Sequence, residues 1–221
     1  PLAHKPVEIV PLGAIASASP AAFKGPQLTP AVVFAGELSA SCGGESLIRA
    51  AKRVLQDHPN LLVFIIGKGP AENSLRHLVE SLDLQAAVTF TGRLEHWRTA
   101  LEAADIFCLP RAGETFREEP IHALAAGLAI VAADDSPYDG FIDGETALLF
   151  SPGDEVGIAD RICLLLDNPE LSARLAAAAQ AHARANHSVA RMVADHVRLY
   201  RQLETRSRTL TLAGSRSPAN A

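Results

Sequence analysis

The stretch Leu62-Val63-Phe64-Ile65-Ile66-Gly67-Lys68-Gly69-Pro70 decides the fold class of this 221-residue chain. Its five apolar residues, uninterrupted by polar ones, indicate a strand that is buried on both faces. The glycines and the proline that follow are typical of a turn at the end of a strand. Beyond the turn, apolar residues three and four positions apart predict a helix over residues 75–82. A buried strand followed by a helix is typical of a parallel sheet covered by helices.

The same alternation recurs along most of the chain. Short apolar or β-branched runs predict further strands at residues 7–10, 32–35, 88–91, 106–109 and 130–133. Helical spacing follows several of them, for example over residues 47–55. We therefore expect an α/β fold with a doubly wound parallel sheet. Extra C-terminal helices are predicted at residues 156–166, 169–185 and 189–203.

These patterns divide the chain into three parts. Residues 1–30 are expected to form an interdomain segment and the first strand, and residues 31–204 a single Rossmann-like domain. Residues 205–221 lack hydrophobic periodicity and contain few large apolar side chains, so we expect a mobile tail. The first residues read like the interior of a longer chain, which suggests that another segment precedes them.

Composition disfavours several classes of function. The net charge is −5 and the basic residues are scattered, so we expect no nucleic acid partner. Cys42, Cys108 and Cys163 lie far apart, with no Cys-x-x-Cys pair and no histidine at zinc-ligand spacing from them, so neither a disulfide framework nor a structural metal is predicted. There is no apolar run of about 18 residues and no signal-peptide pattern. A cytoplasmic location fits best.

Four glycine-containing loops follow predicted strands, at residues 36–44, 67–70, 92–94 and 110–116. The carboxyl ends of parallel strands meet at one edge of the sheet, where helix N-termini offer unpaired N–H groups to a ligand. Glycines there permit close approach to a phosphate or a base. A dinucleotide fingerprint is disfavoured, because Glu72 occupies the third glycine position of the second loop. The Walker motif and the Gly-x-Ser-x-Gly elbow are absent from the sequence.

In order and spacing, these motifs resemble the C-terminal domain of the family 4 glycosyltransferases, retaining enzymes of the GT-B architecture. The resemblance covers about residues 7–203 and rests on segments 9–13, 34–39, 65–70, 88–94, 104–110, 123–132 and 143–149. It implies a nucleoside diphosphate sugar, linked to UDP or GDP, as donor substrate, without a separate cofactor. It also implies an N-terminal acceptor-binding domain outside this chain, a saccharide or lipid-linked acceptor, and a place in polysaccharide biosynthesis. Through that domain, the inner face of the membrane is a further expected location.

The resemblance also assigns roles to individual residues. Glu114 is expected to orient the sugar and His122 the ribose, which makes these two the catalytic candidates. The amides around Gly36 would hold the diphosphate, and the loop at residues 93–94 would contact the base. The donor-binding candidates are Gly36, Glu37, Cys42, Lys68, Arg93, Leu94, Thr115, Phe116 and Arg117.

Several positions depart from the family pattern. The resemblance implies an arginine and a lysine that grip the diphosphate, but Glu37 and Cys42 stand there. It implies a second glutamate at the position of His122, and a glycine pair at residues 135–136, which are Asp and Ser. Cations matter because the leaving diphosphate gains negative charge as the glycosidic bond breaks.

Three explanations of the missing cations stay open. Substitute positive charges could come from Lys68, Arg93, Arg111 or Arg117. Alternatively, the N–H groups at a helix N-terminus act alone, or the site no longer handles a diphosphate. Arg117 stands where the family has glycine, so its side chain either meets phosphate or blocks the sugar pocket.

The sequence therefore leaves two functions open. One is transfer of a hexose-type sugar, with retention, to a saccharide or lipid-linked acceptor. The other is a non-catalytic glycosyltransferase-like module that acts as a binding or scaffold partner. The site residues also have structural explanations: Glu114 as an ordinary acid at a helix start, His122 as a satisfied histidine, and Cys42 as a core residue instead of a nucleophile.

Overall fold

The computed structural model describes residues 10–16, 29–111, 118–136 and 138–214, with side chains described as far as residue 205. Most of the strand that we expected at residues 7–10 lies outside these ranges, and Val10 itself is not in a strand. Residues 215–221 of the expected tail also lie outside them. The boundaries of the three expected parts stay predictions.

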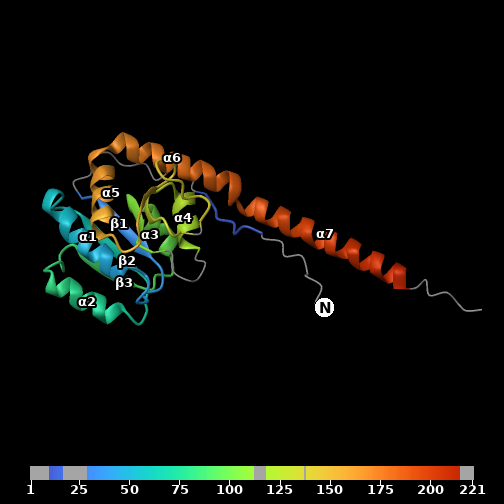
Figure 1. The fold of residues 1–221 in the computed structure, drawn as a ribbon, viewed down its shortest axis with the longest axis horizontal. Coiled ribbons are helices and arrows are strands. Elements are labelled where there is room, and N and C mark those ends of the chain that lie inside the picture. Colours follow the sequence, from blue (N-terminus) through green and yellow to red (C-terminus); the bar gives the residue numbers. More distant parts are fainter. Residues whose placement is uncertain (1–9, 17–28, 112–117, 137, 215–221) are drawn as a thin grey trace, which may run out of the picture.

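Six parallel strands form one sheet in the described residues (Figure 1). Its strands are β1 (Ala31–Ala35), β2 (Leu62–Ile66), β3 (Val88–Gly92), β4 (Ile106–Leu109), β5 (Ala129–Ala133) and β6 (Leu148–Phe150). Their order is β3-β2-β1-β4-β5-β6, so the chain first winds outward from β1 through β2 to β3 and then crosses back to β4. This reversal defines a doubly wound sheet and confirms the expected fold class.

Helices cover both faces of the sheet because neighbouring strand residues point to opposite sides. Val32 and Phe34 of β1 pack in the cluster that holds α1 (Gly44–Asp57), α2 (Glu72–Ser81) and α5 (Glu155–Asp167). Val33 and Ala35 pack in a second cluster. That cluster contains side chains of α3 (Trp97–Glu102), α4 (Glu119–Ala126) and α6 (Pro169–Asn186).

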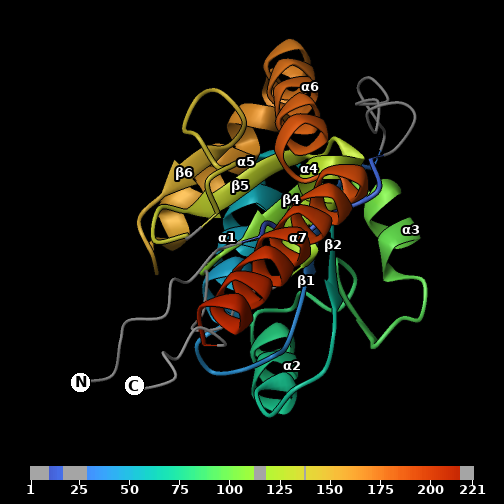
Figure 2. The ribbon, with the colours of Figure 1, turned by 90° about the vertical axis from the view of Figure 1, so that its right-hand side faces the viewer.

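The last helix, α7 (Val189–Gly214), runs away from the sheet and its covering helices (Figure 1, Figure 2). It extends past residue 203, where the sequence predicted its end, because the first glycine or proline after Val189 is Gly214. The base of α7 is attached to an early segment of the chain. The Ala14 amide donates to the His187 carbonyl (2.6 Å), and the Gly13 amide points at the Met192 sulfur (3.2 Å).

Short edge strand β6 is an element that the sequence analysis missed. It has three residues, and it pairs only with β5, through a register that starts at Val131 and Leu148. Within the described part of the chain, no helix has both the length and the hydropathy that crossing a bilayer requires.

Candidate functional site

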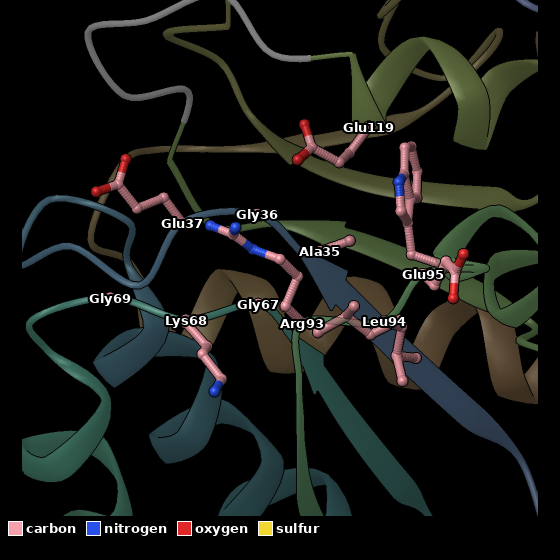
Figure 3. Close-up of a pocket in the computed structure, with 12 residues that line it drawn as sticks. Ala35, Gly36, Glu37, Gly67, Lys68, Gly69, Arg93, Leu94, Glu95 and Glu119 are labelled. Atoms are coloured by element: carbon pink, nitrogen blue, oxygen red, sulfur yellow. The ribbon is translucent and has the colours of Figure 1, made fainter.

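A cavity of about 650 Å³ opens at the carboxyl ends of β1, β2 and β3 (Figure 3). Three of the four predicted glycine loops contribute to it, together with one residue each from α3 and α4. Its described lining is Ala35, Gly36, Glu37, Ile66, Gly67, Lys68, Gly69, Arg93, Leu94, Glu95, Trp97 and Glu119. The structure therefore brings together five of the predicted site residues: Gly36, Glu37, Lys68, Arg93 and Leu94.

Two glycines let the first two loops approach each other closely. Gly67 has a φ of 138°, and a Cβ atom there would overlap the carbonyl oxygen of Gly36. A Cβ atom on Gly69 would overlap the carbonyl oxygen of Leu38 in the same way. Only glycine allows these contacts at unchanged backbone positions.

Backbone hydrogen bonds then hold the three loops together. The Gly36 amide donates to the Ile66 carbonyl (2.9 Å), and the Gly67 amide donates to the Gly92 carbonyl (2.8 Å). The Leu38 amide donates to the Lys68 carbonyl (3.1 Å). The floor of the cavity is thus preformed, because its backbone polar groups are bonded across the loops.

Charged side chains of both signs surround this floor. The described lining contains two basic residues, Lys68 and Arg93, and three acidic residues, Glu37, Glu95 and Glu119. Figure 3 shows the Arg93 side chain extending toward the Gly36 and Glu37 side of the cavity. An anionic ligand would meet two cations here, although the described lining has one more acidic side chain than basic side chains.

Trp97 forms one wall of the cavity and is the only tryptophan of the chain. The Arg98 guanidinium lies 4.7 Å from the centre of the Trp97 ring, in a cation–π contact. The His122 ring also contacts Trp97, edge-on, with the ring centres 5.2 Å apart and an interplanar angle of 89°. Trp97 therefore contacts both the cavity and His122.

His122 is not part of the described lining of this cavity. It lines a second cavity, of about 390 Å³, with Arg98, Glu118 and residues 13, 15, 16, 102, 126 and 189. The Nε atom of Arg98 donates to Nε2 of His122 (3.2 Å), and another Arg98 nitrogen lies 3.1 Å from the Glu118 carboxylate. Burial lowers the pKa of His122 and the Arg98 charge lowers it further, whereas Glu118 opposes the shift.

Cys42 does not face the main cavity either. Its side chain is 1% exposed and packs in the hydrophobic core, where the sulfur receives the Gly44 amide at 3.4 Å. The neighbouring Gly43 has a φ of 74°, and a Cβ atom there would lie 2.7 Å from Cβ of Pro110. The first loop thus packs closely against Pro110 at the end of β4, and the thiol lies in the core.

Arg111 and residues 114–117 are the remaining predicted site residues. Arg111 lies 3.9 Å from the Asp135 carboxylate, with both side chains exposed, so this arginine already faces an acid of the residue 134–136 turn. Glu114, Thr115, Phe116 and Arg117 lie outside the described residues. Their predicted contacts with the sugar and the phosphates stay predictions.

Sequence reasoning missed three lining residues: Glu95, Trp97 and Glu119. Glu119 lies in the first turn of α4, where an acid complements the helix dipole, so its place in the sequence has a structural explanation. Trp97 could have been predicted as a lining residue, because it is the only tryptophan in the sequence and comes soon after the third glycine loop.

Comparison with known proteins gives a consistent result. The family model described as "Glycosyl transferases group 1" matches residues 20–182. The 2-deoxystreptamine N-acetyl-D-glucosaminyltransferase of Niallia circulans is 31% identical over 147 residues, which are 65% of this chain and 38% of that protein. The GDP-mannose-dependent monoacylated alpha-(1-6)-phosphatidylinositol monomannoside mannosyltransferase of Corynebacterium glutamicum is 31% identical over 169 residues, 72% of this chain and 44% of that protein.

A solved structure of the Anabaena protein HepE in complex with UDP has a similar fold. Its TM-score is 0.73 at 20% sequence identity, and the match covers 85% of this chain and 54% of HepE. This chain spans less than half the length of the two curated relatives described above.

Proposed function

The chain belongs to the glycosyl transferases group 1 family, and from this premise we propose that the cavity at the ends of β1, β2 and β3 binds a nucleoside diphosphate sugar. The proposed reaction transfers a hexose-type sugar, with retention, to a saccharide or lipid-linked acceptor. One observation carries the proposal: three interlocked glycine loops surround a preformed cavity of about 650 Å³ that presents Lys68 and Arg93. Cofactor and substrate sites have volumes of this order.

Different residues are proposed to contact the base, the diphosphate and the sugar of the donor. Arg93 and Leu94, at the end of β3, are proposed to contact the base, with Trp97 as an apolar wall beside them. The backbone N–H of Glu37 and the guanidinium of Arg93 are proposed to meet the diphosphate, because the neighbouring N–H groups of Gly36 and Leu38 already donate to backbone carbonyls and Arg93 extends toward this loop (Figure 3). Glu114 is proposed to orient the sugar. A ribose contact of His122 does not enter the proposal, because Arg98 occupies its Nε2 atom.

Positive charge at Arg93 and Lys68 would act mainly on the leaving group. The nucleoside diphosphate becomes more negative as the glycosidic bond breaks, so a nearby cation stabilises the transition state more than the bound donor. This makes Arg93 and Lys68 the substitutes for the arginine and lysine whose places Glu37 and Cys42 occupy. Of the three candidates that the structure describes, Lys68, Arg93 and Arg111, the first two line the cavity.

Relatives support a nucleotide donor but differ in its base. One relative is described as GDP-mannose-dependent, whereas the similar fold of HepE was solved with UDP. The base therefore stays part of the proposal, and the experiment below includes both nucleotides. Acceptor binding is proposed to need the rest of a longer protein, since this chain spans less than half of each curated relative described here.

A second candidate function is a glycosyltransferase-like module that binds a partner without transferring sugar. The charge of the cavity favours it, because three carboxylates in the described lining outnumber two cations. A diphosphate entering the cavity meets the Glu37 carboxylate, and like charges repel. Binding measurements separate the two functions.

Titration with UDP, GDP, UDP-glucose and GDP-mannose tests the proposal, because Trp97 reports on the cavity in a chain with no other tryptophan. We expect at least one ligand to bind with micromolar affinity in calorimetry and to change the Trp97 fluorescence. Arg93→Ala should weaken that binding by roughly tenfold, since it removes a charge-assisted hydrogen bond. Arg53→Ala, an exposed arginine of α1 outside the lining, is the matched control. If none of the four ligands binds, the result contradicts donor binding and supports the scaffold function.

A further inference from the structure

Two imidazoles and one carboxylate meet where α6 joins α7. We call Asp139, His182 and His187 the junction cluster. Asp139 lies between β5 and β6, His182 is on α6, and His187 follows the end of α6. Each residue offers one ligand atom, and the three atoms lie within 4.8 Å of one another. The described lining of the donor cavity contains none of the three.

The ring of His187 has a hydrogen-bond acceptor at each nitrogen. Nδ1 lies 3.3 Å from the carbonyl oxygen of Leu12, and Nε2 lies 3.3 Å from a carboxylate oxygen of Asp139. A neutral imidazole carries a single N–H, so it can donate to only one of these acceptors. A cation held between Nε2 and the carboxylate would satisfy both groups while Nδ1 donates to Leu12.

The contact with Leu12 fits the geometry of a metal ligand. Histidines that bind metals usually donate their other ring N–H to a backbone carbonyl or a carboxylate, which directs the remaining lone pair at the metal. Donation from Nδ1 of His187 to Leu12 produces this arrangement and aims Nε2 toward Asp139. The His187 side chain is 8% exposed and that of Asp139 is 77% exposed, so the ion would be reached from the Asp139 side.

His182 supplies a second imidazole next to this pair. Its ring centre lies 5.8 Å from that of His187, and the two ring planes are inclined by 38°. Gly140 makes room for it, because a Cβ atom there would lie 3.2 Å from Nε2 of His182. The Asn186 amide nitrogen lies 3.4 Å from a ring nitrogen of His182.

We propose that the junction cluster binds a divalent transition-metal cation of the zinc type. Two imidazole nitrogens and a carboxylate oxygen are ligands that suit zinc or cobalt better than magnesium or calcium. Ligand atoms of a tetrahedral zinc ion lie about 3.3 Å apart, which is the separation of His187 and Asp139. Rotation of the half-exposed His182 side chain closes the remaining gap, and water takes the fourth position.

The ion would have a structural role at the base of α7. It would join the segment between β5 and β6, helix α6 and the turn into α7, to which Ala14 is already hydrogen-bonded. Cysteine spacing in the sequence did not predict such a site, but His182 and His187 stand five residues apart, within the spacing of paired zinc-binding histidines, and only Asp139 comes from a distant segment.

Cobalt(II) and zinc(II) titrations of the whole chain test the site. We expect one equivalent of cobalt to give the d–d absorption of a tetrahedral N/O site, and zinc to displace it. Asp139→Asn and His182→Ala should each weaken cobalt binding by at least roughly tenfold, since each removes one of the ligands. The matched control is His77→Ala, which removes an exposed histidine 3.4 Å from the Glu80 carboxylate.

Three results would overturn the site. One is the absence of d–d absorption in the unsubstituted chain, and another is binding by His182→Ala or Asp139→Asn as tight as by His77→Ala. In both cases the 3.3 Å contact between His187 and Asp139 is a direct one that holds no metal ion. The third is thiolate-to-cobalt charge transfer in the near ultraviolet, which would place the ion on the cysteines. Asp139 is exposed, so its conservative substitution leaves the fold available for the test.

Discussion

At the scale of single residues, Glu37 is the side chain whose charge most opposes the proposed ligand. It is exposed and lines the donor cavity, on the side toward which Arg93 extends (Figure 3). We predict that Glu37→Arg tightens UDP or GDP binding by roughly tenfold, about 1.4 kcal/mol, because it replaces a repulsion with an attraction. Calorimetry at low salt measures the change, and the gain should shrink as ionic strength rises.

The control for this charge reversal is Glu145→Arg, on an exposed turn that does not contribute to the described lining. Equal effects of the two substitutions would mean that net charge alone attracts the nucleotide. No effect of Glu37→Arg would mean that the diphosphate does not bind near the Gly36 loop.

His122 gives a prediction about protonation. Burial lowers its pKa below 6.5, the Arg98 charge lowers it further, and Glu118 opposes both. NMR titration of the imidazole should therefore show a higher pKa in Arg98→Met and a lower pKa in Glu118→Gln. Shifts with the same sign in both variants would contradict this account of the pKa.

The lowered pKa also fixes how stability depends on pH. Below pH 6.5 the unfolded chain takes up a proton at residue 122 more readily than the folded chain does. The contribution of neutral His122 to stability is therefore complete above pH 6.5 and is lost as the pH falls through the folded-state pKa. Urea unfolding at several pH values should show a smaller acid-side loss in His122→Gln than in the unsubstituted chain.

Residues that follow a strand directly were the predictable part of the site. These residues lie just beyond the ends of β1, β2 and β3, and they are Gly36, Lys68 and Arg93. The topology of the parallel sheet alone brings those strand ends together. The directions of Cys42 and His122 could not be predicted, because they depend on contacts with distant parts of the chain. The loop of Cys42 packs against Pro110, and Arg98 donates a hydrogen bond to the ring of His122.

At the scale of elements, the contact between the first two loops depends on Gly67. Its φ of 138° disfavours other residues, and a Cβ atom would overlap the Gly36 carbonyl oxygen. We predict that Gly67→Ala lowers the free energy of unfolding by at least about 2 kcal/mol and abolishes nucleotide binding. Urea unfolding followed by Trp97 fluorescence measures the first effect, and calorimetry the second.

Gly144→Ala is the matched control for this substitution. Gly144 also has a positive φ, 71°, but a Cβ atom there would meet nothing within 4 Å. It should cost only about 1 kcal/mol of backbone strain and leave nucleotide binding unchanged. If the two alanines destabilise the chain equally, the close approach of the loops contributes nothing to stability.

The predicted secondary structure differs from the observed one where an element depends on tertiary contacts that the local sequence pattern does not show. Strands β2 and β4 match the predicted residues, because a continuous apolar run marks a buried strand. Strand β6 was missed because three residues carry too little pattern, and its strand conformation depends on pairing with β5. The end of α7 was placed too early because hydrophobic periodicity fades while no helix-breaking residue appears before Gly214.

At the scale of the whole molecule, the sequence predicted a parallel sheet but not the order of its strands. Alternating strands and helices are compatible with several orders, and the return from β3 to β4 beside β1 is a long-range event. That return matters for function, because it puts the N-terminus of α4, with Glu119, beside the loops of β1, β2 and β3.

The uneven burial of the molecule leads to a prediction about its unfolding. Trp97 reports on the sheet and its cavity, whereas α7 extends away from them and exposes Val193, Tyr200 and Leu203 (Figure 1). A helix with so little tertiary packing is marginal in water. We predict that far-ultraviolet circular dichroism loses part of its helical signal at a lower temperature than that at which Trp97 fluorescence changes.

A nucleotide that binds the cavity should shift only the second of these steps. At a concentration 100 times its Kd, it stabilises the sheet domain by about 2.7 kcal/mol. For a domain of this size, that corresponds to a shift of roughly 5 to 10 °C in the fluorescence midpoint. A chain that ends at Arg198 is the control, and it should lose the first step while keeping the second. Coincident transitions in the complete chain would instead mean that α7 and the sheet unfold as one cooperative unit, because two probes of a two-state protein report the same midpoint.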